Sequence, residues 1–301
     1  MSNRVIHLSN VSKRYGDFTA VKDINFSVKR GEVVGFVGPN GAGKTTTISL
    51  LLGFQSATKG TVRLYEEPIL PSTAHRTHRR IGYAAGDMAF FDNLTGEQYL
   101  EFMAHRFGIN IEIRARLDNR LSPQLHTRLK QLSRGNKQKI GLIAALQHDP
   151  ELIILDEPTS GLDPLMQETF LTLIREEAER GATVFMSSHI LSEVAAVCSR
   201  VIFMKKGRIV SDTLVSEIEQ SAGKLIRISG SEHEIKLLLA TIPDAVDIES
   251  STETSVILQC RGDIHLVLRW LASKRFADIS IEDRQLDDLF LDLYQDEEHV
   301  S

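Results

Sequence analysis

Hydrophobic and polar positions fall into short blocks along the first third of the chain. Apolar stretches bounded by turn residues, such as VKDINFSV and EVVGFVG, predict strands. A helical pattern over about residues 44–52 follows and ends at Gly53, a residue typical of helix ends. Further along, the apolar stretches ELIILDEP and GATVFMSSH are separated by a helical pattern. Strands joined through a helix in this way predict a parallel α/β core.

Two other regions have a different pattern. About residues 87–149 are helical in pattern and predict a helical insert in the α/β core. After a hairpin that turns at Lys206 and Gly207, the tail changes to strand, helix, two strands, helix and strand, which is the order of a split βαβ sandwich. We therefore expect an α/β domain over residues 1–215 and a small α+β accessory domain over residues 222–301, which closes with the acidic helical stretch LDDLFLDLYQDE.

Composition and charge restrict the class of protein. The chain has 301 residues, of which 42% are hydrophobic and 25% charged, as in ordinary globular proteins. Its net charge of −5 does not favour nucleic acid as a partner, and the basic stretch at residues 75–80 is interpreted as a solvated loop or docking surface. The two cysteines, Cys198 and Cys260, indicate free thiols in a reducing cytosol. No apolar stretch approaches the roughly 18 residues that a membrane span requires.

The most specific motif is a glycine-rich loop, GPNGAGKT, between a predicted strand and a predicted helix. Glycines allow backbone N–H groups to converge on phosphates at the start of a helix. Lys44 is expected to neutralise the β- and γ-phosphate oxygens, and the Thr45 hydroxyl to bind Mg²⁺. A glycine-rich turn without a ligand is the alternative. The residues expected to hold the nucleotide are Gly38, Pro39, Asn40, Gly41, Ala42, Gly43, Lys44, Thr45 and Thr46.

Three further polar residues follow predicted strands. In LIILDEP, the adjacent carboxylates Asp156 and Glu157 leave the strand on opposite sides. We expect Asp156 to hold Mg²⁺ and Glu157 to polarise an attacking water, although two solvated acids are the alternative. His189 stands where the next strand ends and is expected to reach the γ-phosphate as a hydrogen-bond donor.

The stretch LSRGNKQKI places Ser133 and Gly135 at the expected start of another helix, where an anion would bind favourably. The chain already has one phosphate-binding loop of its own. The sequence therefore raises the question of which anion this second helix start would bind.

The order of the glycine-rich loop, LSRGNKQ, LIILDEPTSGLD and SSH resembles the nucleotide-binding cassette of ABC transporters over about residues 5–211. The resemblance implies a P-loop NTPase fold with a parallel-sheet core, N-terminal antiparallel strands and a helical insert. It also implies that two cassettes, expected to be a homodimer, face head to tail and enclose two ATP molecules with Mg²⁺. Ser133 and Gly135 would then contact the γ-phosphate of ATP held by the other chain.

The resemblance assigns roles to two further residues, and the chain departs from the family at two places. Asp163 would lie at the seam between the two cassettes, and Tyr15 would stack on adenine, with plain strand packing as its alternative. Gly86 stands where the family has a glutamine that contacts Mg²⁺; either Asp87 replaces it as a metal ligand or the two residues form a simple turn. Arg134 stands where the family usually has glycine, and we expect it to make an additional cationic contact.

The function that the resemblance implies is ATP hydrolysis that powers transport, with export favoured because the tail is similar to that of exporter cassettes of the multidrug-resistance type. A transmembrane permease on a separate chain would dock in a groove of the helical insert, which places the cassette in the cytoplasm at the membrane surface. The alternative is a soluble ABC-type regulatory ATPase that is not coupled to a permease.

Overall fold

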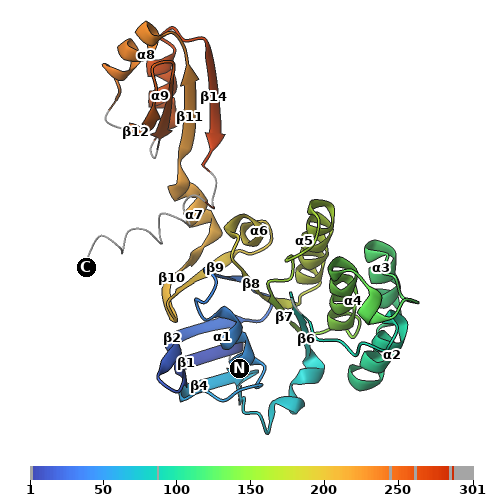
Figure 1. Ribbon diagram of the computed structural model, residues 1–301. Helices are drawn as coiled ribbons and strands as arrows, with labels where there is room; N and C mark the ends of the chain where they lie inside the picture. The colour runs from blue at the N-terminus through green and yellow to red at the C-terminus, as the bar shows by residue number, and fades with distance from the viewer. Residues whose placement is uncertain (1–2, 87, 244–245, 261–262, 285–286, 288–301) are drawn as a thin grey trace. The chain divides into compact units, whose positions relative to one another are not determined.

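The computed structural model describes residues 3–86, 88–243, 246–260, 263–284 and 287 (Figure 1). It divides into two compact units, Met1–Thr213 and Leu214–Ser301. Each unit has its own sheets and core, and each is described by itself below. None of the described helices is long and apolar enough to cross a membrane.

The first unit begins with an antiparallel sheet of strand order β2-β1-β4-β5. Its strands are β1 (Arg4–Tyr15), β2 (Phe18–Lys29), β4 (Lys59–Leu64) and β5 (Glu67–Pro68). Alternating apolar positions put one face of this sheet in the core, where Ile6 of β1 pairs with Leu64 of β4 and both are fully buried. The N-terminal antiparallel strands implied by the family resemblance are therefore present.

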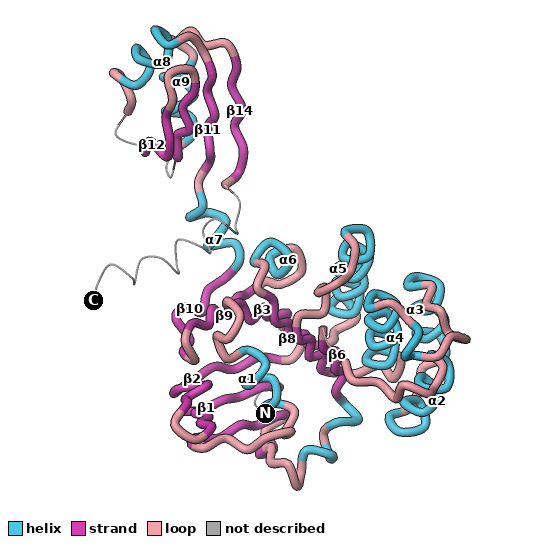
Figure 2. The backbone as a smooth tube through the Cα atoms, viewed as in Figure 1, coloured by secondary structure: helices cyan, strands magenta, loops and turns pink. Residues whose placement is uncertain are grey.

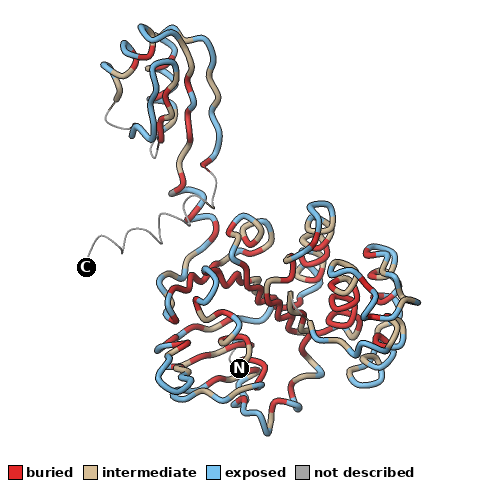
Figure 3. The backbone as a smooth tube through the Cα atoms, in the orientation of Figure 1, coloured by how far each residue is buried: buried red, intermediate tan, exposed pale blue. Residues whose placement is uncertain are grey.

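The second sheet of this unit has the order β10-β9-β3-β8-β7-β6 (Figure 2). Its strands are β3 (Val33–Val37), β6 (Ile81–Ala85), β7 (Leu152–Asp156), β8 (Thr183–Ser188), β9 (Arg200–Lys205) and β10 (Arg208–Leu214). Strands β6, β7, β8, β3 and β9 run parallel, so their carboxyl ends meet at one edge of the sheet. These strands are buried almost throughout (Figure 3), which explains their continuous apolar sequences.

Aromatic rings join the two sheets. Phe185 of β8 stacks on Phe26 of β2 with ring centroids 5.7 Å apart, and Phe36 of β3 lies 5.3 Å from Phe185. Because two of these rings are fully buried, the β2 strand that precedes the glycine-rich loop is fixed against the parallel sheet.

Helices surround the parallel sheet and form the insert. The helices of the core are α1 (Lys44–Leu51), α5 (Pro164–Glu179) and α6 (Leu191–Ala195), and those of the insert are α2 (Gly96–Phe107), α3 (Ile111–Leu121) and α4 (Arg134–Leu146). Short 3₁₀ turns occupy Ala74–Arg76, His78–Arg80 and Leu129–Gln131. Each insert helix starts at a polar cap, Thr95, Asn110 or Ser133, whose side chain accepts from a backbone N–H of the first turn. The predicted helical insert is thus confirmed.

The second unit has the strand and helix order that the sequence pattern predicts. After α7 (Val215–Ala222) come β11 (Lys224–Ser229), α8 (Glu232–Leu239), β12 (Val246–Ser251), β13 (Ser255–Cys260), α9 (Ile264–Leu271) and β14 (Asp278–Asp283). The strands form an antiparallel sheet of order β12-β13-β11-β14, and α8 and α9 bury apolar residues against it. The expected acidic helix over residues 286–297 lies outside the described residues, apart from Asp287.

Candidate active site

The glycine-rich loop leaves β3 and curls around the side chain of Lys44. The Lys44 ammonium donates hydrogen bonds to the carbonyl oxygens of Gly38, at 2.6 Å, and Pro39, at 3.2 Å. Gly43 has a φ of 109°, and a Cβ at this position would lie only 2.6 Å from the Ala20 carbonyl oxygen. Only glycine therefore allows the loop to turn here into α1, whose first residue is Lys44.

Two carboxylates stand at the carboxyl end of β7, Asp156 as its last residue and Glu157 directly after it. Asp156 is buried, and its Oδ1 accepts a hydrogen bond from the Ser187 hydroxyl at 2.6 Å. The next residue, Glu157, has a φ of 50°, which turns the chain sharply, and its N–H donates to the same hydroxyl at 3.1 Å. Ser187 therefore fixes both acids at the end of the strand. The sequence does not predict this role, because nothing in the SSH motif distinguishes Ser187.

The turn at Glu157 directs its side chain at two other expected site residues. Its Oε1 lies 3.1 Å from the Lys44 ammonium, and its Oε2 lies 3.1 Å from Nδ1 of His189. The structure thus brings together Lys44, Glu157 and His189, which are far apart in the sequence. A cation, a carboxylate and an imidazole at these distances suit proton transfer to or from a water at a phosphate.

A cavity of about 230 Å³ lies over Lys44 and Glu157, and His189 reaches it only through its contact with Glu157. It is lined by Phe18, Ala20, Asn40, Gly41, Gly43, Lys44, Thr45, Thr46 and Glu157. Phe18 was not expected from the sequence; it is the first residue of β2, and its ring is 66% exposed. Its only sequence signal is an aromatic residue directly after a Gly-Asp turn, close to Tyr15.

Tyr15 is 43% exposed but does not line this cavity. Its hydroxyl donates to the side-chain oxygen of Gln55, and the Lys13 ammonium lies 5.1 Å from the centre of its ring. The stacking of Tyr15 on adenine therefore stays a prediction.

The chemistry of the donor set fits Mg²⁺. The Thr45 hydroxyl and the Asp156 carboxylate are the oxygen ligands that this ion prefers, and Mg²⁺ completes its coordination with phosphates and waters. Among the described residues, no group of three or more His, Cys, Asp or Glu side chains could hold a metal on its own. The expected contribution of Asp87 falls on a residue outside the described part of the chain.

Gly86 cannot be replaced without moving the chain around it. Its N–H donates to the Asp156 carbonyl oxygen at 2.7 Å, and a Cβ on Gly86 would lie 2.6 Å from the Glu157 carbonyl oxygen. The ends of β6 and β7 are therefore closer than any side chain at position 86 allows. A side chain as large as glutamine therefore does not fit at position 86 with the strand ends in this arrangement.

The residues of the second expected phosphate contact lie apart from the cavity. Ser133 caps α4 by accepting from the Asn136 N–H, and Gly135 lies in the first turn of that helix. Asp163 caps α5 by accepting from the Met166 N–H at 3.0 Å. None of these residues lines the cavity formed by the glycine-rich loop.

Arg134, between Ser133 and Gly135, is held by its own chain. Its Nη2 donates to the Ser160 hydroxyl at 2.9 Å, and its side chain lies across Gly161, where a Cβ would come within 2.8 Å of the Arg134 Cδ. The single chain thus already provides a partner for the guanidinium. A contact between Arg134 and phosphate stays a prediction.

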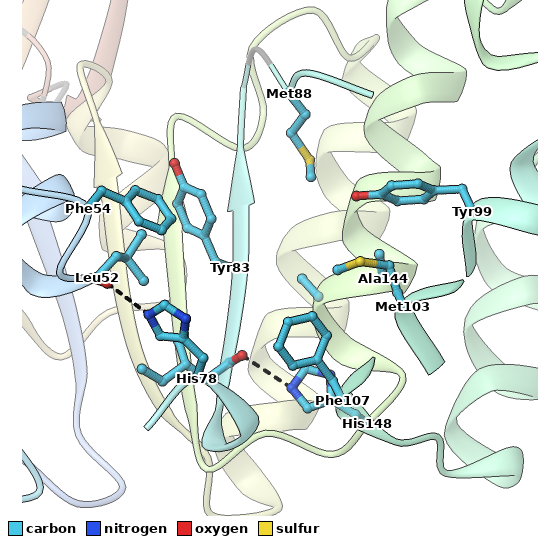
Figure 4. Close-up of a pocket in the computed structure, with 12 residues that line it drawn as sticks. Leu52, Phe54, His78, Tyr83, Met88, Tyr99, Met103, Phe107, Ala144 and His148 are labelled. Atoms are coloured by element: carbon cyan, nitrogen blue, oxygen red, sulfur yellow. Dashed lines mark hydrogen bonds between the residues drawn. The ribbon is translucent and has the colours of Figure 1, made fainter. Parts of the chain in front are cut away.

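A second, apolar groove of about 240 Å³ separates the core from the helical insert (Figure 4). It is lined by Leu52, Phe54, His78, Ile81, Tyr83, Met88, Tyr99, Met103, Phe107, Ala144, Ala145 and His148. The two histidines are bound to backbone carbonyls, His78 to Leu52 and His148 to Ile81. Burial lowers the pKa of His148, so this ring is neutral at pH 7. Burial, with a smaller contribution from the Asp156 carboxylate, raises the pKa of Tyr83 to about 12.

Comparison with known proteins identifies the family. Residues 21–160 match the family model described as ABC transporter. The chain is 35% identical to the bacitracin transport ATP-binding protein BcrA of Enterococcus faecalis, over 77% of this chain and 76% of that protein. The chain is an ABC transporter ATP-binding protein. It is also 31% identical to the Nod factor export ATP-binding protein I of Paraburkholderia xenovorans (strain LB400), over 97% of this chain and 98% of that protein.

The fold agrees with this membership. A solved ATP-binding subunit of an ABC transporter matches with a TM-score of 0.65 and 27% identity, over 72% of this chain and 92% of that one. The P-loop fold and the family expected from the motifs are confirmed. As a member of this family, the ABC subunit binds nucleotide, hydrolyses ATP and acts together with a membrane component of a transporter.

Proposed function

We propose that this ABC subunit works in an exporter, as one of two identical chains that share two ATP sites and dock on a permease encoded separately. The proposal that two chains share the ATP sites rests on one observation. In one chain, Lys44 and Glu157 line the cavity and His189 contacts Glu157, whereas Ser133 and Gly135 lie at the start of another helix and do not line it. A second copy in head-to-tail orientation would supply the missing helix start to each cavity.

The ion pair between Lys44 and Glu157 suggests how ATP starts the reaction. The γ-phosphate competes for the Lys44 ammonium, which is almost fully buried and has the Glu157 carboxylate as its only ion-pair partner among the described residues. Once Lys44 turns to the phosphate, the carboxylate is free to accept a proton from water. His189, already 3.1 Å from the same carboxylate, orients it and donates toward the phosphate.

The Thr45 hydroxyl and the Asp156 carboxylate would hold Mg²⁺ in this site. When bound, it neutralises the negative charge that develops on the phosphates. The chain's own contribution is to hold the Asp156 carboxylate in place through the Ser187 hydroxyl.

The apolar groove is the surface that we assign to the permease. Its walls come from both the core and the helical insert, and an amphipathic helix with one apolar face fits a groove of this composition (Figure 4). The export direction is supported by relatives whose names specify bacitracin transport and Nod factor export.

Replacement of Phe54 by glutamate tests the groove. Phe54 lines the groove with its ring 58% exposed, so a carboxylate here is tolerated by the fold but places a charge where the apolar helix would dock. We expect recovery of the chain with membranes to fall at least about tenfold, corresponding to about 1.4 kcal/mol of lost binding, while ATP turnover of the purified chain changes less than about twofold.

The matched control is Ile111→Glu, which changes an apolar residue that is 77% exposed and does not line the groove. Recovery is measured as the fraction of the chain that co-purifies with a membrane polypeptide after detergent extraction. Equal recovery of both variants would rule out the groove as the docking surface. Absence of the unmodified chain from the membrane fraction would contradict docking on a separately encoded permease.

A further inference from the structure

The strand β8 ends in two serines whose side chains point to opposite sides. Ser187 bonds to the Asp156 carboxylate and to the Glu157 N–H, as described above. Ser188 is buried on the other side, where its hydroxyl donates to Oε2 of Glu193 at 3.0 Å and accepts from the Ile190 N–H at 3.0 Å. Ser188 therefore connects the end of the strand to Glu193, which is not one of the expected site residues.

Glu193 lies on the short helix α6, four residues after His189 in the sequence. The same carboxylate oxygen, Oε2, also accepts a hydrogen bond from the Thr159 hydroxyl at 2.8 Å. Thr159 and Ser188 are only 5% and 3% exposed, so two buried hydroxyls converge on one carboxylate oxygen. Hydrogen bonds from buried donors to a charged acceptor are stronger than exposed neutral ones, which makes this a rigid junction.

The two hydroxyls belong to the two segments that carry the reacting side chains. Thr159 follows Glu157 by two residues, and Ser188 directly precedes His189. Glu193 therefore links the segment after β7 to the end of β8, close to the contact between Glu157 and His189.

The link stabilises an uncommon backbone conformation at Glu157. Its φ of 50° lies in the left-handed region, which a residue with a side chain rarely adopts unless the surrounding structure enforces it. The hydrogen bond that the Glu157 N–H donates to the Ser187 hydroxyl holds the start of this turn, and the bond from the Thr159 hydroxyl to Glu193 holds its continuation. Without the second bond, the turn could relax and move the Glu157 carboxylate away from His189.

We propose that Glu193 is a positioning residue for ATP hydrolysis. Its carboxylate fixes the segments after β7 and β8 relative to each other and so keeps Glu157 and His189 within hydrogen-bonding distance, without contacting the nucleotide itself. This inference rests on the proposed role of Glu157 and His189 in hydrolysis.

The test separates kcat from the binding of ATP. For Glu193→Ala we expect kcat to fall about 10- to 100-fold, because small displacements of a reacting group have effects of this size, while KM and Kd for ATP stay within about twofold. Glu193→Gln keeps an acceptor oxygen at the same distance and should recover most of the lost kcat. Glu179→Ala, a change at an exposed glutamate of α5, serves as the matched control and should have no effect.

Thr159→Val removes one of the two donors with little change in volume. If Glu193 acts through Thr159, Thr159→Val should lower kcat, and the double variant with Glu193→Ala should lose no more than Glu193→Ala alone. This pair also keeps the test decisive if Glu193→Ala does not fold, since Thr159→Val with Glu193→Gln can replace it.

An unchanged kcat in Glu193→Ala, a loss of kcat matched by an equal rise in KM, or additive losses in the double variant would each overturn the inference. The proposed catalytic roles are tested separately by Lys44→Ala and Glu157→Gln. If those variants lose turnover while Glu193→Ala does not, only the role of Glu193 is wrong.

Discussion

Lys44→Ala is expected to lower ATP turnover by at least about 10²- to 10³-fold, because it removes the positive charge that opposes the phosphates inside a partly enclosed site. Among the described residues that line the cavity, Lys44 alone is positively charged. Its ammonium is positioned by the carbonyls of Gly38 and Pro39, so a lysine elsewhere in the chain cannot replace it. Affinity for ATP is expected to fall as well.

The measurement is steady-state phosphate release together with the Kd for ATP. Lys59→Ala, at the exposed start of β4, is the control, and it should retain both properties. Turnover of Lys44→Ala within a few-fold of the unmodified chain would show that the site is assigned wrongly.

Glu157→Gln is expected to show the second large effect, a fall in kcat of about 10²- to 10⁴-fold, the usual contribution of a general base. The amide keeps the size of the side chain but cannot take a proton from water. Binding of ATP should be preserved, because the glycine-rich loop and Lys44 are unchanged. The variant should therefore retain intact ATP where the unmodified chain releases ADP.

Phosphate release and the identity of the bound nucleotide are measured on Glu157→Gln beside Glu168→Gln, a change at an exposed glutamate of α5. Full turnover of Glu157→Gln would exclude Glu157 as the base. Equal and negligible turnover in the unmodified chain and in Glu157→Gln would instead indicate a nucleotide-dependent switch that does not hydrolyse ATP.

The parts of the site that depend on local sequence could be predicted. The glycine-rich loop follows a strand and precedes a helix, a context in which spacing alone determines the backbone. Asp156 and Glu157 end an apolar strand, and that order places them at the carboxyl edge of a parallel sheet. Such features need no knowledge of distant residues.

The parts of the site that depend on packing between distant segments could not be predicted from the sequence. The hydrogen bond from Ser187 to Asp156 follows from the register of β7 against β8, which pairs these two residues, and the bond from Thr159 to Glu193 joins a loop to the helix α6. Phe18 enters the cavity only because β2 is fixed beside the loop. The apolar groove likewise combines residues from the core and the helical insert, whose spacing in the sequence gives no sign that they meet.

The surroundings of Gly86 also depend on contacts that the sequence does not reveal. The sequence shows that the family's glutamine is missing, but only the structure shows that the Glu157 carbonyl occupies the space of a side chain at this position. The close approach of the ends of β6 and β7 therefore requires glycine at this position.

We infer that one chain holds only half of each hydrolysis site. The most direct test is the molar mass of Glu157→Gln in solution, measured by light scattering with and without ATP. We predict that ATP doubles the mass, and that adding Ser133→Arg, which places a bulky side chain at the start of α4, abolishes the doubling. A chain that binds ATP without any increase in mass would contradict the account.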